Sequence, residues 1–440
     1  MKRRRVLSSA CGVFALCALL SCRSTLDSLG GELDSVDAGG GSESGGASSE
    51  AGNDAGASDA GASDALPTPV PLTPLTSYPN AFRDLLGQTD DAIASKLDKA
   101  FTQLFYGDAD NQAIYVKVGD DRAYIHDVLH DDIRTEGSGI GMIITVELGK
   151  KEEFDRLWTY AKASLQETTG PATGYFKSIC DDDTVCYDPY GMEQMATALL
   201  FAHDRWGSTS ATPYGSEALK LIALLADKEL DNGGVVNDIT SVFDATTALP
   251  REQPALASSG YTRSSLQMPS VFELWAQATG DAFWHRAGQA ASAGLLASAD
   301  ATTGLWPIRN YFDGKLVPGS DIYRSQGYRT QFNLALDTAW GGGSADHTDL
   351  ANRVLAFFTA QGLTTYGGSY STTGSVLDPT RDVALIAANG ALAVAASASN
   401  RSKFVSAVWS MDIPTGQVRY YGGLLYLMSL MVLSGQYQVL

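Results

Sequence analysis

The spacing of twelve segments with helical periodicity constrains the fold more than any other feature of this sequence. Apolar residues recur at helical intervals through nearly all of residues 77–440, which is typical of amphipathic helices. Within five consecutive pairs of segments the connection is short, and short connections make neighbouring helices antiparallel. The expected helices lie at 90–105, 137–149, 151–167, 191–206, 214–229, 264–279, 281–299, 326–340, 345–361, 379–396, 400–410 and 418–434.

The long connections between these pairs indicate how the pairs are arranged. Antiparallel pairs either stack into an open solenoid or close into a ring, and the sequence lacks the repeated signature of a solenoid. We therefore expect an all-α fold, an (α/α)6 barrel in which the last helix pairs with the first. Every long connection then enters at one end of the ring, where functional side chains should gather: residues 107–136, 168–190, 230–263, 300–325 and 362–378.

Tyrosines, arginines and carboxylates dominate the residues just before the expected inner helices. Helix capping accounts for Thr135 and Ser264, but not for so many tyrosines and arginines at one end of the ring. Aromatic faces stack on sugar rings and polar groups bind hydroxyls, so this composition favours a sugar-binding groove. The residues are Asp132, Arg134, Glu136, Asp188, Tyr190, Tyr261, Arg263, Tyr323, Arg324, Gln326, Tyr328, Arg329, Asp378, Arg381, Asp382, Arg419, Tyr420 and Tyr421.

One cluster has the composition of a metal site. His126 and His130 are four residues apart, beside Asp127 and Asp131. The segment lacks helical periodicity, and Asp-rich loops are usually only solvated. No phosphate-binding glycine motif precedes an expected helix. We therefore expect neither a metal site nor a cofactor.

The N-terminus resembles the export signal of a bacterial lipoprotein. Four basic residues at 2–5 precede an apolar stretch at 6–20, which is too short to span a bilayer permanently. The stretch ends in Leu19-Leu20-Ser21-Cys22, a lipobox-like motif. We expect cleavage after residue 21 and a lipid on Cys22; an ordinary signal peptide is the alternative. Arg23 does not resemble an inner-membrane retention residue, which favours the outer membrane or surface of the cell envelope.

Residues 22–76 differ from the rest of the chain in composition. Gly, Ser, Ala, Asp and Pro make up most of this segment, and so few apolar side chains favour a disordered tether.

The formal charge of the whole chain is −19, and removal of the four basic residues within 1–21 brings it to −23. Such a charge disfavours nucleic acid and anionic surfaces. The expected partner is a neutral glycan, with membrane contact through the lipid alone.

Two cysteines remain in the folded part after export. Cys11 and Cys17 lie in the signal segment, and Cys22 would carry the lipid. Cys180 and Cys186 lie close together in an acidic loop without other soft metal ligands nearby. An oxidising compartment favours a disulfide between them.

Several motifs along residues 77–440 closely resemble glycoside hydrolase family 8. The most specific is Asp132-Ile133-Arg134-Thr135-Glu136-Gly137. Within the family, the chain looks most like the exo-acting enzymes that release xylose from the reducing ends of xylo-oligosaccharides. Further matches are Leu104-Phe105-Tyr106-Gly107, Val118-Gly119-Asp120-Asp121, Phe272-Glu273-Leu274-Trp275, Asn333-Leu334-Ala335-Leu336-Asp337 and Arg419-Tyr420-Tyr421.

The resemblance implies inverting hydrolysis, which uses one carboxyl group as acid and another as base across the sugar. It makes Glu136 the general acid. Burial or a neighbouring carboxylate must then raise its pKa, because a helix N-terminus stabilises the anion. Arg134 should grip a carboxylate or line the groove. The other expected substrate contacts are Tyr190, Arg263, Tyr328, Arg329, Tyr420 and Tyr421.

The chain departs from the family pattern at three acidic positions. Gln326 stands where the resemblance places the catalytic base, and Tyr190 and Arg263 stand at two other acidic positions. One interpretation is that Asp188 or Asp321 has taken over as base. The other is that the domain binds glycan and has lost hydrolysis.

The favoured function is inverting hydrolysis of a β-1,4-linked glycan, with xylan fragments first, glucan second and chitosan third. The main alternative is a glycan-binding lipoprotein with the same fold and without the base. A structural envelope protein is a third possibility, against which the loop aromatics argue.

Overall fold

The computed structural model describes residues 68–180 and 184–440. The expected signal segment, Cys22 and residues 22–67 of the tether lie outside the described residues. Among the described helices, none combines the length and apolar character that a membrane crossing requires.

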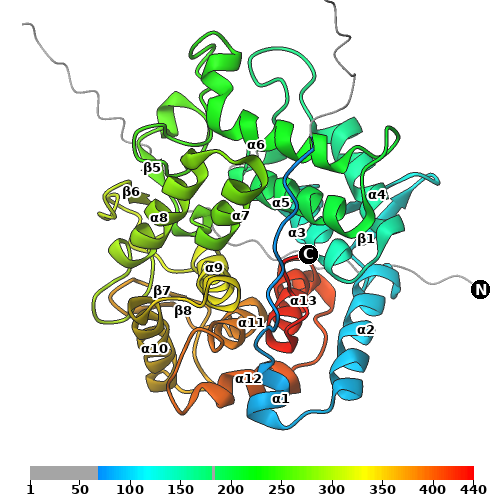
Figure 1. Cartoon of the computed structure of the whole chain (residues 1–440). Helices are drawn as coiled ribbons and strands as arrows, with labels where there is room; N and C mark the ends of the chain where they lie inside the picture. Colours follow the sequence, from blue (N-terminus) through cyan, green and yellow to red (C-terminus); the bar gives the residue numbers. More distant parts are fainter. Residues whose placement is uncertain (1–67, 181–183) are drawn as a thin grey trace, which may run out of the picture. The chain divides into compact units, whose positions relative to one another are not determined.

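Helices form a closed ring of two layers (Figure 1). In the inner layer α3 packs against α5, and contacts continue through α7, α9, α11 and α13 back to α3. This closure confirms the (α/α)6 barrel. The described helices are α1 (Ala81–Leu86), α2 (Asp90–Tyr106), α3 (Thr135–Glu147), α4 (Lys151–Tyr160), α5 (Pro189–Trp206), α6 (Tyr214–Asp231), α7 (Pro269–Thr279), α8 (Ala282–Ala297), α9 (Ser325–Gly341), α10 (Ala345–Ala360), α11 (Val383–Leu392), α12 (Arg401–Ser410) and α13 (Tyr421–Ser434).

Each inner helix packs against an outer helix that is its neighbour in the chain, and α2 packs against α13. All twelve expected helices are present, and the short helix α1 was not anticipated. Two boundaries differ clearly. The helix expected from residue 264 begins at Pro269 after a 3₁₀ turn, Ser264–Leu266, and the helix expected from residue 379 begins at Val383.

Burial follows the two layers. Every residue of α11 after Val383, and nearly every residue of α13, is buried. Outer helices such as α4 bury one stripe only, with Phe154, Leu157 and Trp158. A helix that is apolar all round belongs inside a protein, whereas an amphipathic one covers a surface.

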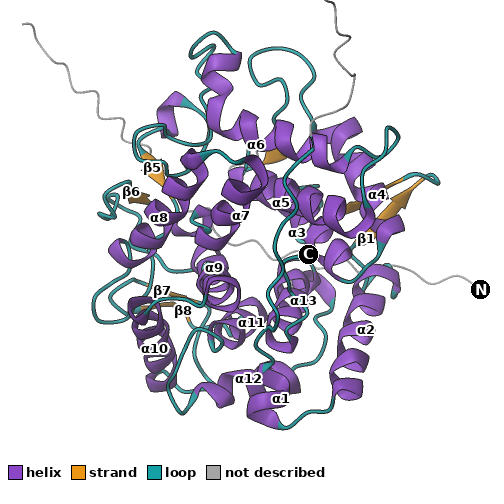
Figure 2. Cartoon of the chain, in the orientation of Figure 1, coloured by secondary structure: helices purple, strands orange, loops and turns teal. Residues whose placement is uncertain are grey.

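Four small two-stranded antiparallel sheets lie in the long connections (Figure 2). Their strands are β1 (Tyr115–Val118) with β2 (Arg122–Ile125), β3 (Ser178–Ile179) with β4 (Val185–Cys186), β5 (Tyr261–Thr262) with β6 (Asn310–Tyr311), and β7 (Ser369–Tyr370) with β8 (Val376–Asp378). In the sheet of β5 and β6, whose strands come from two different long connections, Tyr261 is opposite Tyr311 and Thr262 is opposite Asn310. These sheets lie in the loops at the end of the ring where the inner helices begin.

Residues 68–76, at the end of the expected tether, lie against the ring. The Val70 N–H donates to the Ala278 carbonyl at 2.9 Å, and the Leu72 N–H donates to the Asp204 carboxylate at 3.2 Å. Leu72 is buried. Ala278 and Asp204 are near the C-terminal ends of α7 and α5, so the chain reaches the barrel at the end opposite the inner-helix N-termini.

Candidate active site

A pocket of about 900 Å³ lies where the inner helices begin. Its walls come from long connections and from the first turns of α3, α9, α11 and α13. Of the expected site residues, the pocket is lined by Arg134, Glu136, Asp188, Arg263, Gln326, Arg329, Tyr420 and Tyr421. The long connections therefore gather these side chains from distant parts of the sequence.

Glu136 lies in the first turn of α3, and its side chain is 16% exposed. Burial raises the pKa of its carboxyl group, the Arg329 guanidinium lowers that pKa, and Asp188 raises it. The N-terminus of α3 also favours the anion. The net pKa is raised because loss of solvation outweighs the single ion pair. A carboxyl group with a raised pKa in a pocket has the property that a general acid needs.

Arg329 lies on α9, which stands opposite α3 in the ring, and its side chain reaches Glu136. Its side chain is 5% exposed and forms an ion pair with Glu136. Its guanidinium also lies 4.3 Å from the centre of the Tyr190 ring. Stacking and pairing together fix this arginine beside the acid. Tyr190 is itself buried. It therefore helps to hold Arg329 in place and does not present its ring for stacking against a sugar.

Arg134 is held by two carboxylates. Its Nε lies 3.0 Å from Asp132 Oδ1 and 3.2 Å from Asp127 Oδ2. Asp127 is buried, and its carboxylate also contacts His130 Nδ1 at 2.8 Å and accepts the Leu129 N–H at 3.1 Å. Arg134 thus grips carboxylates and lines the pocket, the two roles expected of it.

Two glycines bring α3 and α5 into close contact beside the acid. A side chain on Gly191 would collide with the Thr135 carbonyl group and the Glu136 backbone nitrogen, and one on Gly139 would collide with the Gly191 carbonyl oxygen. The contact places the N-terminus of α5 against that of α3. Asp188, the N-cap of α5, accepts the Gly191 N–H at 3.3 Å and lines the same pocket as Glu136.

The two relocated-base candidates have different environments. Asp188 is a pocket residue. Asp321 is not among the residues lining the pocket, and its carboxylate accepts hydrogen bonds from the backbone and hydroxyl of Thr372, the former at 2.8 Å. The geometry therefore does not support Asp321 as the base. Gln326 does line the pocket, and its side-chain oxygen accepts the Ser325 hydroxyl at 3.0 Å.

Asp382 is a pocket carboxylate that the sequence placed among the groove residues but did not identify as a candidate base. It caps α11 by accepting the Ala384 N–H at 2.8 Å. Burial raises the pKa of its carboxyl group, while the Ala384 N–H and the Tyr328 hydroxyl lower it. The expected helix start at residue 379 placed Asp382 inside a helix. The sequence feature that could have identified Asp382 as a candidate base is its position just before an inner helix, which it shares with Asp188.

The three remaining tyrosines differ in their access to the pocket. Tyr420 and Tyr421 line it, and the Tyr421 hydroxyl donates to the Ser325 carbonyl at 2.6 Å. Tyr328 is buried, bonds to the Gly368 carbonyl and is not a pocket-lining residue. The expectation that Tyr328 contacts substrate is therefore not supported by its position, because the side chain is buried and its hydroxyl is bound by the Gly368 carbonyl and by Asp382.

Arg263 lies beside a carboxylate that the sequence did not reveal. Glu252, in the long connection before β5, is 2% exposed and pairs with both Arg263 and Arg309. All three residues line the pocket. No periodicity or motif marks Glu252, so only the folded chain shows this cluster.

The β3–β4 hairpin forms another wall. Cys180 and Cys186 form the expected disulfide, with Cα atoms 5.8 Å apart, and both line the pocket. Within the part of the chain that the structure describes, no group of three or more His, Cys, Asp or Glu side chains could hold a metal ion. His126 instead pairs with Asp131, and His130 with Asp127.

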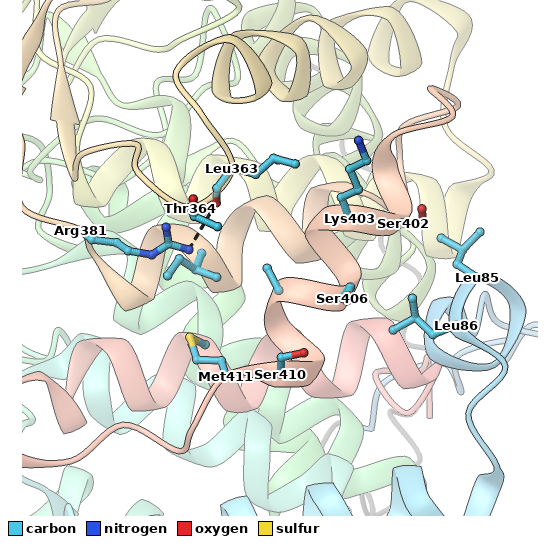
Figure 3. A pocket seen from close by; sticks show the side chains of 12 residues that line it. Leu85, Leu86, Leu363, Thr364, Arg381, Ser402, Lys403, Ser406, Ser410 and Met411 are labelled. Carbon is cyan, nitrogen blue, oxygen red and sulfur yellow. Dashed lines mark hydrogen bonds between the residues drawn. The ribbon is translucent and has the colours of Figure 1, made fainter.

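A second cavity of about 730 Å³ lies between α1, α12 and the loop before α11 (Figure 3). Leu86, Ser406 and Met411 are among its lining residues, and Arg381 donates to the Leu363 carbonyl at its edge, at 3.4 Å. It shares no lining residue with the first pocket and contains no carboxylate side chain. The chemistry that the sequence predicts therefore belongs to the first pocket.

Comparisons with known proteins agree with this geometry. Residues 125–435 match the family described as glycosyl hydrolases family 8. The reducing-end xylose-releasing exo-oligoxylanase Rex8A of Paenibacillus barcinonensis is 32% identical, over 82% of this chain and 97% of that protein. Endoglucanase C of Ruminiclostridium cellulolyticum is 23% identical, over 70% of this chain and 64% of that protein.

Solved structures show the same relationship. A GH8 xylobiose complex from Teredinibacter turnerae superposes with a TM-score of 0.77 and 33% sequence identity. The match covers 82% of this chain and 97% of that one.

Proposed function

Because the chain belongs to the glycosyl hydrolases of family 8, we propose that it hydrolyses β-1,4-linked xylo-oligosaccharides with inversion of the anomeric centre. The observation that carries this proposal is Glu136, a pocket carboxyl group whose pKa is raised mainly by burial. The xylose-releasing relatives and the xylobiose complex support xylan fragments as the first substrate class. The endoglucanase match keeps glucan second, and chitosan stays third.

In the proposed mechanism, Glu136 donates its proton to the leaving oxygen while a second carboxylate removes a proton from water. That carboxylate must lie across the sugar, roughly 6.5–9.5 Å from the acid. Asp188 and Asp382 both line the pocket. Asp188 borders the acid on α5, whereas Asp382 caps α11, the ring neighbour of α9 on which Gln326 stands. These two residues are the candidate bases.

The proposal is tested with residues 68–440 and xylo-oligosaccharides, following the products and the anomeric form of the released sugar. Glu136→Gln should lower kcat by about 10²–10⁴-fold. Glu273→Gln, at an exposed position paired with His285, is the matched control and should leave kcat unchanged. Asp188→Asn and Asp382→Asn separate the two bases, since only loss of the true base should match the defect of Glu136→Gln.

A second function is favoured by Gln326. Its amide lines the pocket at the position where the resemblance places the base, and an amide orients water without accepting its proton. The domain would then bind glycan without cleaving it. Binding of xylo-oligosaccharides with no turnover in the parent protein would establish this function and reject the hydrolase.

We also propose that the chain is exported as a lipoprotein anchored through Cys22 in the bacterial outer membrane. The support is the basic start, the apolar stretch and the lipobox-like motif. Mass spectrometry of the mature N-terminus tests it. A lipid-modified Cys22 in the outer-membrane fraction is expected, and an unmodified N-terminus at another residue would reject the anchor.

A further inference from the structure

Two arginines in the pocket wall are placed opposite each other by the two-stranded sheet of β5 and β6, whose strands come from different long connections. Tyr261 pairs with Tyr311 and Thr262 with Asn310. The next pair in the same antiparallel register is Arg263 and Arg309. Like charges facing each other across two paired strands are destabilising unless they are compensated.

Glu252 compensates part of the positive charge of these two arginines. Its Oε1 accepts Arg263 Nε at 2.8 Å and Arg309 Nε at 2.6 Å. Its backbone N–H donates to the Tyr261 carbonyl at 2.8 Å, which holds Glu252 against strand β5. Two guanidinium groups and one carboxylate leave the cluster with a formal charge of +1.

The ratio of arginines to carboxylates in this cluster differs from that around the other pocket arginines. Arg134 is bound by Asp127 and Asp132, and Arg329 by Glu136. Among the described residues lining the pocket, only Arg263 and Arg309 share a single carboxylate.

The donors of the cluster that Glu252 leaves free belong to two residues that line the pocket. Both arginines use their Nε edge on Glu252, and Arg309 makes no other hydrogen bond within the described residues. The Arg309 side chain is 46% exposed, compared with 5% for Arg329 beside the acid. Arg309 thus has a planar pair of Nη groups on a side chain that is more exposed to solvent than that of Arg329.

We propose that this cluster is a subsite for a carboxylate carried by the glycan, as in an oligosaccharide that bears one uronic-acid residue. This inference rests on the proposed function, since it assigns a substrate feature to the same pocket. A guanidinium fork matches the planar geometry of a carboxylate and binds it through two parallel hydrogen bonds. A single acidic group suits the cluster, while the charge of −19 on the whole chain disfavours a polyanion.

The test compares three ligands on residues 68–440 carrying Glu136→Gln, so that turnover does not consume them. The ligands are xylotetraose, xylotetraose with one glucuronic-acid substituent, and the methyl ester of that substituted compound. Calorimetry at low salt should show about tenfold tighter binding of the free acid than of its ester, as expected for one charge-assisted contact. The preference should shrink as salt is raised.

Arg309→Gln should remove this preference while leaving the affinity for xylotetraose within twofold. Arg286→Gln, at an exposed position on α8 outside the pocket, should keep the preference. Equal affinity for the acid and its ester would overturn the subsite and leave the proposed function intact. Failure of all three ligands to bind would overturn the proposed function together with the subsite.

Discussion

The behaviour of Glu136 depends on two opposing contributions at the level of single residues. Burial raises the pKa of the carboxyl group, and the guanidinium of Arg329 lowers it. An acid catalyst must hold its proton at the working pH, so the high-pH limb of activity should follow this pKa. The ion pair therefore sets how far into the alkaline range the proposed enzyme works.

Arg329→Gln removes the contribution that lowers the pKa of Glu136. The pKa should rise further, and the alkaline limb of the kcat profile should move to higher pH. We also expect kcat to fall about tenfold or more, because the arginine holds the acid in position. The measurement is a pH–rate profile of the variant, with Arg329→Lys as the charge-retaining control. An unmoved alkaline limb would show that Arg329 does not control the acid.

Glu193 gives a second prediction, which does not depend on activity. It is fully buried on α5, and neither carboxyl oxygen has a hydrogen-bond partner among the described residues. Burial raises its pKa well above the usual value. The folded state therefore keeps the proton while the unfolded chain loses it near pH 4.5, so this residue lowers stability progressively as the pH rises.

Glu193→Gln should raise the thermal midpoint by a few degrees at pH 8 and change it little at pH 4. Thermal unfolding at both pH values, with the exposed Glu273→Gln as control, measures this difference. A variant less stable than the parent at pH 8 would show that the carboxylate is needed in its ionised form.

At the level of elements, the meeting of α3 and α5 positions the acid. Gly191 lies against the backbone of Thr135 and Glu136, and Gly139 lies against Gly191. Since backbone atoms cannot move aside as a flexible side chain can, an added methyl group must push the two helix N-termini apart.

Gly191→Ala should destabilise the domain by about 1–3 kcal/mol, the usual cost of overpacking, and should lower kcat more than it raises KM. Chemical unfolding and steady-state kinetics measure the two effects. Gly260→Ala is the matched control, because a side chain there meets no atom within 4 Å. Unchanged kinetics in Gly191→Ala would mean that the helix contact does not position Glu136.

The elements also show what the sequence could predict. Helix periodicity and connection length depend on local patterns, so they gave the twelve helices, their pairing and the functional end of the ring. Arg134 and Glu136 were found because their motif is contiguous. The partnership of Glu252 with Arg263 and Arg309 joins side chains 11 and 57 residues apart. Such distances carry no local pattern, and for the same reason the sequence did not show that Asp321 and Tyr328 lie outside the lining of the pocket.

At the level of the whole molecule, the chain enters the barrel at the end opposite the pocket. The pocket lies at the N-termini of the inner helices, whereas residues 68–76 contact α5 and α7 near their C-terminal ends. Gln277 holds this segment by donating to the Pro71 carbonyl at 3.1 Å and to the Thr73 hydroxyl at 2.7 Å. Residues 68–76 therefore do not cover the pocket.

Leu72 is the apolar contact of this segment, at 6% exposure, while Leu75 is 41% exposed. Leu72→Ala should therefore lower the free energy of unfolding by about 2 kcal/mol, and Leu75→Ala should change it by less than about 0.5 kcal/mol. Urea unfolding of residues 68–440 gives both values. Residues 77–440 alone should be at least as destabilised as Leu72→Ala, because deletion removes the hydrogen bonds as well. Equal stability of the two lengths would instead place the start of the folded domain at residue 77, and would make residues 68–76 a continuation of the tether.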